Sequence, residues 1–392
     1  MRIALSGMFW TEPHVGSGQY LHHLMSRFSA NPAQHRFILI IPRYRLGKQS
    51  KPVLPQIQTV AMPTPFDRRN ANLAKLWFEH VAFGQACRKL RVDVAHVPYF
   101  GPPRYAAMPV IATVHDLIPI LVPENRGGRA VQAYMRLASA GARRADMIIA
   151  DSHHTKQDVV KQLGIPSQRI EVTHLAASEA LQPQPRQAIA AVQEKFRLDV
   201  PYIFYIGGFQ AHKNLATALR AFARVRRSVS QRVVFAIAGR LPTAVSALFP
   251  DIHQVILEEG IAADVALLGP VSEQEKAALL SGCAAFVFPS RYEGFGLPPL
   301  EAMQCGAPVL ASATTSVGEV VGDGGIQLPP TDIDAWVDAL GRVLADEQAQ
   351  AALRERGIVR AAAFSWKQTA QQTLAVYERV AHGSGRKAAH EI

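Results

Sequence analysis

Residues 288–303 read FPSRYEGFGLPPLEAM, and this stretch decides the fold. An apolar run ends at Phe288, a glycine-rich turn follows, and Pro299 suits the first turn of a helix. In doubly wound parallel sheets, ligands bind beyond the carboxyl ends of the strands, and helix-start amides hold phosphate oxygens. The stretch therefore predicts a phosphate-binding loop, in which Glu293 and Glu301 accept hydrogen bonds from sugar hydroxyls. Alternatively, Glu301 only complements the helix dipole and Glu293 is a solvated loop residue.

Strands and helices are expected to alternate on both sides of this stretch. Apolar runs predict strands at Arg2–Gly7, Phe37–Ile41, Val92–His96, Val110–Val114, Met147–Ala150, Ile203–Ile206, Val233–Ala238, Val265–Leu268, Ala284–Phe288, Val309–Ala311 and Ile326–Leu328. Helical patterns cover Ser17–Phe28, Asn72–Leu90, Gly128–Ala142, Asn214–Val225, Ser272–Ser281, Pro299–Cys305, Asp332–Ala345 and Glu347–Ala363. Continuously apolar strands that alternate with helices indicate parallel sheets covered on both faces, so the fold class is α/β with two Rossmann-like domains.

The expected domain boundaries follow from this pattern. The first domain covers residues 1–182 and the second residues 198–365, and the seam at Leu181–Arg197 starts with the extended sequence Gln182-Pro183-Gln184-Pro185-Arg186. An amphipathic helix over residues 366–382 follows, and the stretch Gly383–Arg386 is expected to fray.

Composition limits the class of protein. The chain has 392 residues, of which 48% are hydrophobic and 19% charged, so a disordered or disulfide-stapled chain is excluded. Its isolated cysteines, Cys87, Cys283 and Cys305, indicate a reducing compartment and offer no zinc motif. The N-terminus reads as a strand rather than a signal peptide, and no apolar run is long enough to span a bilayer. A soluble, cytoplasmic protein is expected.

The positive charge is concentrated in the first half. Residues 1–182 contain 22 Lys and Arg against 11 Asp and Glu, whereas residues 183–392 contain 20 of each. One basic domain is expected to face an anionic partner: nucleic acid, the inner face of an anionic membrane, or a phosphorylated acceptor. A basic surface that serves only solubility is the alternative.

The sequence EGFGLPPLEAMQCGAPVLAS at residues 293–312 resembles the E-x7-E segment of retaining glycosyltransferases of family 4. Val320–Gly325 and the Phe364-Ser365-Trp366 ending are similar to that family too. The resemblance covers nearly the whole chain. It implies the GT-B fold, in which two Rossmann-like domains face a central cleft and the last helix packs back on the first domain.

The resemblance also assigns roles within the second domain. It implies that Glu301 binds the nucleotide ribose and that Glu293 acts on the transferred sugar. The turn that joins them, made of Gly294, Phe295, Gly296 and Leu297, would belong to the donor site.

A second segment, Gly207-Gly208-Phe209-Gln210-Ala211-His212-Lys213-Asn214, resembles the donor-phosphate loop of the family. Lys213 matches the family's lysine, but Gly208 stands where an arginine is usual. Arg240 follows the next strand and is the natural substitute, as in the mannosyltransferase-like branch. Fixed cations here would stabilise the departing nucleoside diphosphate without a metal, which gives Lys213 a catalytic role.

The first domain supplies further candidates at the ends of strands. Thr113-Val114-His115-Asp116 is similar to the family's V/I-H-D segment, so His115 would contact the transferred sugar or its phosphate. Asp116 would orient that imidazole or shape the acceptor site. Ser152 resembles a serine near the family's cleft, although it also reads as an ordinary helix N-cap. Gly16 and Gly18 would bring backbone amides close to the donor, or only allow tight packing.

A basic and aromatic helical stretch begins at Arg68. It contains Arg68, Arg69 and Trp77, which are candidate acceptor-side residues on an anionic membrane surface. The alternative is an ordinary amphipathic helix packed on its own sheet.

These observations lead to one functional hypothesis with alternatives. The sequence offers no DxD segment near the donor loops and no His/Asp pair with ligand spacing, so we expect no cofactor and no metal. We expect a retaining glycosyltransferase that moves mannose from GDP-mannose to a lipid-linked or oligosaccharide acceptor in polysaccharide assembly. A UDP- or dTDP-sugar donor, or a nucleotide-sugar epimerase, is the alternative. Nucleic acid is not expected as a partner because no RNA-binding signature is present.

Overall fold

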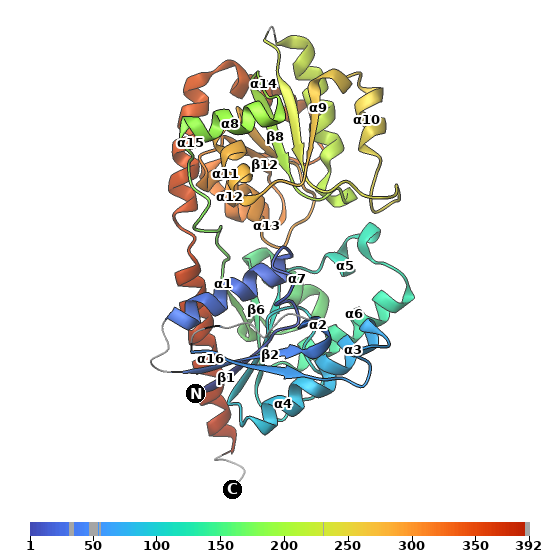
Figure 1. Cartoon of the computed structure of the whole chain (residues 1–392), viewed down its shortest axis with the longest axis vertical. Coiled ribbons are helices and arrows are strands. Elements are labelled where there is room, and N and C mark those ends of the chain that lie inside the picture. The colour runs from blue at the N-terminus through green and yellow to red at the C-terminus, as the bar shows by residue number, and fades with distance from the viewer. Residues whose placement is uncertain (31–34, 47–53, 55, 230, 389–392) are drawn as a thin grey trace. The chain divides into compact units, whose positions relative to one another are not determined.

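The computed structural model describes residues 1–30, 35–46, 54, 56–229 and 231–388 (Figure 1). The chain divides into two compact units. The first contains Met1–Pro119, Gly127–Leu175 and the chain from Trp366 onward, and the second contains Ile120–Arg126 and Ala176–Ser365. Within the described ranges, no helix has both the length and the hydropathy needed to cross a bilayer.

The first unit is built on a parallel sheet of seven strands in the order β3-β2-β1-β4-β5-β6-β7. The strands are β1 Arg2–Ser6, β2 Arg36–Pro42, β3 Gln58–Met62, β4 Val94–Val97, β5 Val110–Val114, β6 Met147–Ala150 and β7 Ile170–Val172. The helices of this part are α1 Gly16–Ala30, α2 Arg43–Leu46, α3 Ala71–Trp77, α4 Phe83–Lys89, α5 Ile118–Leu121, α6 Arg129–Arg144, α7 His153–Leu163 and α16 Trp366–Ala388. A short 3-10 turn lies at Ser167–Arg169, and another lies at Pro123–Asn125, within the segment Ile120–Arg126 that belongs to the second unit.

The two edge strands, β3 and β7, were not predicted from the sequence. Strand β3 has no fully buried residue, and β7 is only three residues long. Their sequences therefore lack the continuous apolar run that marks the inner strands.

The helix expected over Asn72–Leu90 is interrupted by a π-helical turn at Phe78–Ala82. There, the N–H of Phe83 donates to the carbonyl of Phe78, five residues earlier. Asn70 caps the start of α3 by accepting from the N–H groups of Asn72 and Leu73. Turns of this kind occur frequently at functional sites.

The second unit is built on a parallel sheet of six strands in the order β10-β9-β8-β11-β12-β13. The strands are β8 Tyr202–Ile206, β9 Val234–Ala238, β10 Val265–Gly269, β11 Ala285–Phe288, β12 Val309–Ser312 and β13 Ile326–Leu328. The helices are α8 Arg186–Phe196, α9 Leu215–Ser228, α10 Ile252–Glu258, α11 Glu273–Gly282, α12 Leu297–Gln304, α13 Thr315–Val321, α14 Ile333–Ala345 and α15 Glu347–Ala361. Short 3-10 turns lie at Ala211–Lys213, Ala262–Asp264 and Gly322–Gly324.

One face of this second sheet carries a large apolar core. Phe222 of α9, Phe235 of β9 and Trp336 of α14 are fully buried in it. The only polar atom of the Trp336 side chain donates to the carbonyl of Pro329 at 2.9 Å, so the indole is buried without an unsatisfied N–H.

The expected seam at Leu181–Arg197 is only partly extended. The structure forms α8 at Arg186–Phe196, which packs on α11 within the second unit. Pro185 has an extended backbone immediately before α8, and Arg197 closes the helix in a left-handed conformation. The prediction of a linker rested on the Gln-Pro repeat, which ends where the helix begins.

The last helix belongs to the first unit, where α16 packs against α1 (Figure 1). The Tyr377 hydroxyl lies 2.6 Å from Nδ1 of His96 on β4, and His96 Nε2 lies 2.8 Å from the Thr113 hydroxyl on β5. Burial lowers the pKa of His96 to about 3, so this imidazole is neutral. The helix continues to Ala388, six residues beyond the end that the sequence predicts at residue 382.

Candidate active site

Two loops of the second unit meet because their strands are neighbours. Strand β8 pairs with β11, and all strands of the sheet are parallel, so the residues after both strands lie at one carboxyl edge. The ammonium of Lys213 donates to both carboxylate oxygens of Glu293, at 2.8 and 3.0 Å. The hydroxyl of Ser290 donates to Glu293 Oε1 at 2.6 Å. Both members of the ion pair are largely buried, so the two charges are held in fixed positions.

Backbone contacts hold the Lys213 loop against the Glu293 loop. Asn214, in a left-handed conformation with φ 56°, donates through its side-chain amide to the carbonyls of Pro289 and Pro330. The carbonyl of His212 accepts from the N–H of Arg291 at 2.7 Å. Asparagine tolerates this conformation better than most residues, which explains its place directly after the lysine.

The backbone around Glu293 is fixed from a third side. Its N–H donates to Oγ1 of Thr315 at 3.2 Å, and its carbonyl accepts from the Ser316 hydroxyl at 2.8 Å. Thr315 has φ 56°, a left-handed conformation that is rare for a β-branched residue. Strain of this kind costs of order 1–3 kcal/mol and clusters at functional sites.

The turn between the two glutamates leads into α12, which begins at Leu297 rather than at Pro299. Gly294 and Phe295 are buried, and Phe295 packs edge-on against Phe364. Gly296 has φ 104°, which favours glycine, and it places its neighbours at the helix start.

Glu301 is paired with a lysine that the sequence analysis missed. Lys276 of α11 donates to Glu301 Oε2 at 3.0 Å and lies at the same distance from Glu273. Burial raises the pKa of Glu301, and the Lys276 ammonium acts in the opposite direction. Glu301 is thus a largely buried carboxylate held by one cation. No sequence pattern separates Lys276 from the exposed lysines of other helices.

The glycine pair of the phosphate loop lies beside the segment that carries Arg240. A Cβ on Gly239 would lie 2.3 Å from the carbonyl oxygen of Gly207, and its φ of 144° also favours glycine. A Cβ on Gly208 would lie 2.1 Å from the side chain of Gln210. The backbones of residues 207 and 239 therefore touch, which brings the next residue, Arg240, to the loop. The Arg240 side chain is exposed and has no hydrogen bond or ion pair with a described residue.

In the first unit, His115 is held by Asp151 and not by Asp116. Nδ1 of His115 lies 2.7 Å from Asp151 Oδ2, and Nε2 lies 3.2 Å from the carbonyl of Pro98. Burial favours the neutral imidazole, but the charge and hydrogen bond of Asp151 outweigh it, so the pKa of His115 is raised. The Asp116 carboxylate instead accepts from the N–H of Ile118 at 2.8 Å. The expectation that Asp116 orients the imidazole is therefore wrong.

Strand pairing offered a signal that the sequence analysis did not use. Val114 on β5 is paired with Ala150 on β6. The next residues, His115 and Asp151, are therefore side by side at the end of these parallel strands. Knowledge of which residues of β5 and β6 are paired would have predicted the contact between His115 and Asp151.

Ser152 and Gly18 have clear structural functions, whereas Gly16 does not. Ser152 is the N-cap of α7, since its hydroxyl accepts from the N–H of Thr155 at 3.0 Å. A Cβ on Gly18 would lie 2.0 Å from the carbonyl oxygen of Glu12, so only glycine fits there. Gly16 begins α1 and has open space around its Cα.

Arg68, Arg69 and Trp77 lie at the solvent side of the α3 region. Both arginines are exposed, and Trp77 is more than one-third exposed although its ring packs edge-on against Phe66. Leu73, four residues before Trp77 on α3, is exposed as well. Residues 68–77 thus contain two exposed basic side chains and two exposed large apolar side chains.

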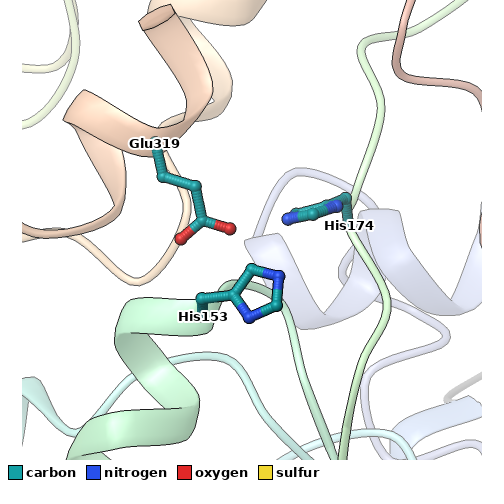
Figure 2. Close-up of side chains that lie close together, drawn as sticks. All are labelled: His153, His174 and Glu319. Carbon is teal, nitrogen blue, oxygen red and sulfur yellow. The ribbon is translucent and has the colours of Figure 1, made fainter.

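Two histidines of the first unit come together although they are far apart in the sequence. The ring centroids of His153, at the start of α7, and His174, after β7, are 5.7 Å apart (Figure 2). Glu319, also labelled in Figure 2, belongs to the second unit. Two imidazoles do not by themselves make up the three or four protein ligands of a zinc site.

Two family models match this chain. A family model described as "Glycosyltransferase Family 4" matches residues 15–177, and one described as "Glycosyl transferases group 1" matches residues 187–360.

Two curated relatives are mannosyltransferases. The chain is 29% identical over 295 residues to the O-antigen chain mannosyltransferase B of Escherichia coli, a match that covers 75% of this chain and 76% of the relative. It is also 29% identical over 278 residues to the serotype-specific mannosyltransferase WbdA of Escherichia coli, a match that covers 70% of this chain and 34% of that protein.

Among solved structures, sucrose-phosphate synthase from Thermosynechococcus elongatus is similar with a TM-score of 0.77 at 20% identity, over 97% of this chain and 99% of that one. The likeness confirms the GT-B fold predicted from the sequence. Together, the two family models and these relatives show that the chain belongs to the glycosyltransferases of family 4.

Proposed function

We propose that this glycosyltransferase transfers mannose from GDP-mannose, with retention of the anomeric configuration and without a metal. The observation that carries the proposal is the buried Lys213–Glu293 pair on the two glycine-rich loops of the second unit. The names of the two Escherichia coli relatives support mannose as the transferred sugar.

Lys213 stabilises the departing diphosphate, as a fixed cation in a water-poor site does most effectively. Arg240 supplies a second positive charge, and its exposed guanidinium is available to a ligand. Glu301 accepts hydrogen bonds from the ribose hydroxyls, and Glu293 contacts the mannose. The backbone N–H groups of residues 294–297 and of the Gly207–Gly208 loop donate to phosphate oxygens of the donor.

The reaction proceeds on one face of the sugar. The bond from C1 of mannose to the phosphate oxygen breaks, and the acceptor oxygen forms a bond to C1 on the same face. The proton of the acceptor hydroxyl passes to a phosphate oxygen of the leaving GDP, so no protein base is needed. His115, whose pKa is raised by Asp151, donates from Nε2 to the transferred sugar or its phosphate, in exchange for its contact with the Pro98 carbonyl.

The acceptor is a lipid-linked or free oligosaccharide bound by the first unit. Gly16 and Gly18, in the first turn of α1, and Ser152, the N-cap of α7, are candidate donor-binding residues, and Asp116 is a candidate acceptor residue. The exposed Arg68, Arg69 and Trp77 support peripheral contact with an anionic membrane at its cytoplasmic face, because basic and aromatic side chains together favour that interface.

Product analysis tests this proposal. The enzyme is incubated with GDP-mannose and an octyl α-mannoside, with EDTA in one arm, and the new linkage is identified by NMR. We expect an α-linked product in both arms. A β-linked product would contradict retention, and loss of activity in EDTA that magnesium restores would contradict metal independence. A changed sugar nucleotide without any acceptor would instead indicate an epimerase.

A further inference from the structure

The first unit contains a second group of polar side chains, centred on Lys75 of α3. The Lys75 ammonium lies 4.2 Å from the ring centroid of Tyr134 on α6 and 6.0 Å from that of Phe9. It also lies 3.9 Å from Oε1 of Glu79, which is one helical turn further along. The hydroxyl of Tyr134 donates to the same Glu79 oxygen at 3.1 Å.

Neither charge of this pair has all its hydrogen-bonding positions filled. The side chain of Glu79 is 0% exposed, and its Oε2 has no hydrogen-bond partner. The Lys75 side chain is 27% exposed, and its ammonium donates no hydrogen bond to any described residue. Contacts with aromatic rings orient an ammonium but do not replace a hydrogen-bond acceptor. Lys75 is therefore a fixed, partly accessible donor.

The group lies at the carboxyl edge of the first sheet, beside the loop that contacts His115. Phe9 follows β1, and Tyr99 follows β4, with their ring centroids 5.0 Å apart. Pro98, the neighbour of Tyr99, supplies the carbonyl that meets His115 Nε2. Gly101 closes the group, since a Cβ there would lie 2.6 Å from the Tyr99 ring and 2.8 Å from the Tyr134 hydroxyl.

The surroundings of the ammonium indicate the kind of ligand. Lys75 is a single cation that Glu79, whose pKa burial raises to about 7, compensates in part, so the group offers a phosphate at most one positive charge. A neutral hydroxyl can accept from the ammonium without disturbing that balance. The half-buried rings of Phe9 and Tyr134 place apolar carbon next to the ammonium, as polyhydroxylated rings with one apolar face require.

We propose that Lys75 donates a hydrogen bond to a hydroxyl of the acceptor saccharide, with Phe9 and Tyr134 packed against the sugar. Glu79 and Tyr134 are positioning residues for the Lys75 ammonium. The inference deepens the proposed function and rests on its assignment of the acceptor to the first unit.

Calorimetric titration tests this site directly. Octyl α-mannoside, octyl α-glucoside and octyl α-galactoside are titrated into the full chain in the presence of GDP, and GDP itself is titrated separately. The wild type is expected to bind at least one glycoside. Lys75→Met should weaken that binding about tenfold, as expected when one hydrogen bond from a charged group is lost. Lys75→Arg should restore part of the affinity, and GDP affinity should stay within twofold of the wild type.

Matched variants separate binding from folding. Lys161→Met removes an exposed lysine from α7 of the same unit and should leave glycoside binding unchanged. Lys75→Met strands the buried Glu79, so the double variant Lys75→Met/Glu79→Gln, which keeps the group neutral, is measured as well.

Each outcome decides the inference. Unchanged glycoside affinity in Lys75→Met and in the double variant Lys75→Met/Glu79→Gln would overturn it. A wild type that binds none of the glycosides would overturn it as well. Octyl phosphate that binds the wild type more tightly than the glycosides, and is lost in Lys75→Met, would overturn the saccharide assignment in favour of a phosphate. If the wild type transfers no mannose but Lys75→Met still loses glycoside binding, the proposed donor fails and this site stands.

Discussion

The lysine–glutamate pairs of the two units are held differently. In the second unit, Lys213 and Glu293 meet at 2.8 Å and Lys276 and Glu301 at 3.0 Å. In the first unit, Lys75 and Glu79 remain 3.9 Å apart, and aromatic rings surround the ammonium.

The difference corresponds to two kinds of ligand. A nucleoside diphosphate carries charge that grows as the bond to the sugar breaks, and rigid cations stabilise it without reorganisation. A saccharide acceptor is neutral, so aromatic surface and single hydrogen bonds suit it better than strong ion pairs. We expect variants in the second unit to alter donor chemistry, and variants in the first unit to alter acceptor binding and protonation.

The largest effect is expected at Lys213. Lys213→Ala removes the proposed diphosphate cation and should lower kcat about a hundredfold or more, the usual effect of losing one group that stabilises developing charge. Steady-state kinetics measure the loss, and thermal unfolding checks the fold. Lys195→Ala, at an exposed lysine of the same unit, serves as the control. A fully active Lys213→Ala enzyme would remove this loop from the donor site.

The free energy of unfolding should depend on pH through the buried carboxyl group of Glu79 in the first unit. Burial raises the pKa of Glu79 to about 7 from its ordinary value of 4.5, although Lys75 and Tyr134 favour its ionised form. Folding therefore favours the protonated acid, and this contribution, about 3 kcal/mol, is present below pH 4.5 and lost as the pH rises to about 7. Glu79→Gln, which does not titrate, should lack that loss.

Urea unfolding of both proteins at pH 5, 6, 7 and 8 measures this difference. Glu355→Gln, at an exposed glutamate of α15, should behave like the wild type. Parallel pH curves for the wild type and Glu79→Gln would show that Glu79 titrates as it does in the unfolded chain.

A smaller effect should separate the two glutamates of the second unit. Glu301→Gln should weaken GDP binding about tenfold, because the ribose hydroxyls lose a charged acceptor. Glu293→Gln should not weaken GDP binding, because GDP lacks the mannose that Glu293 contacts and the neutral amide leaves the Lys213 charge uncompensated. Calorimetric titration of GDP measures both, and equal affinity of both variants would refute the division of roles.

The smallest change is expected at the His115 pair. Asp151→Asn keeps the shape of the side chain and removes the charge that raises the pKa of His115, so this pKa should fall. Asp116→Asn should lower it less, because Asp116 acts on the imidazole only through its charge. NMR titration of the imidazole reports both shifts. A larger fall for Asp116→Asn would restore Asp116 as the orienting residue.

The inner strands and the loops after β8 and β11 were predictable from the sequence, because buried parallel strands are continuously apolar and glycine marks the turns. The contacts that fix the site were harder to predict from the sequence. Lys276 pairs with Glu301 across two helices, and the Asp151–His115 contact requires the register of β5 and β6. The Lys75 group includes a contact between Glu79 and Tyr134, which are 55 positions apart, and the hydrophobic pattern does not predict it.

The most direct test of the account is a thermal-shift panel of GDP, UDP, ADP and dTDP with and without magnesium. A ligand that binds only the folded state at 100 times its dissociation constant adds about 2.7 kcal/mol of stability. We expect GDP to raise the unfolding temperature of the protein with and without magnesium. A shift with UDP or dTDP alone would contradict the mannose donor, and no shift with any nucleotide would contradict the donor site itself.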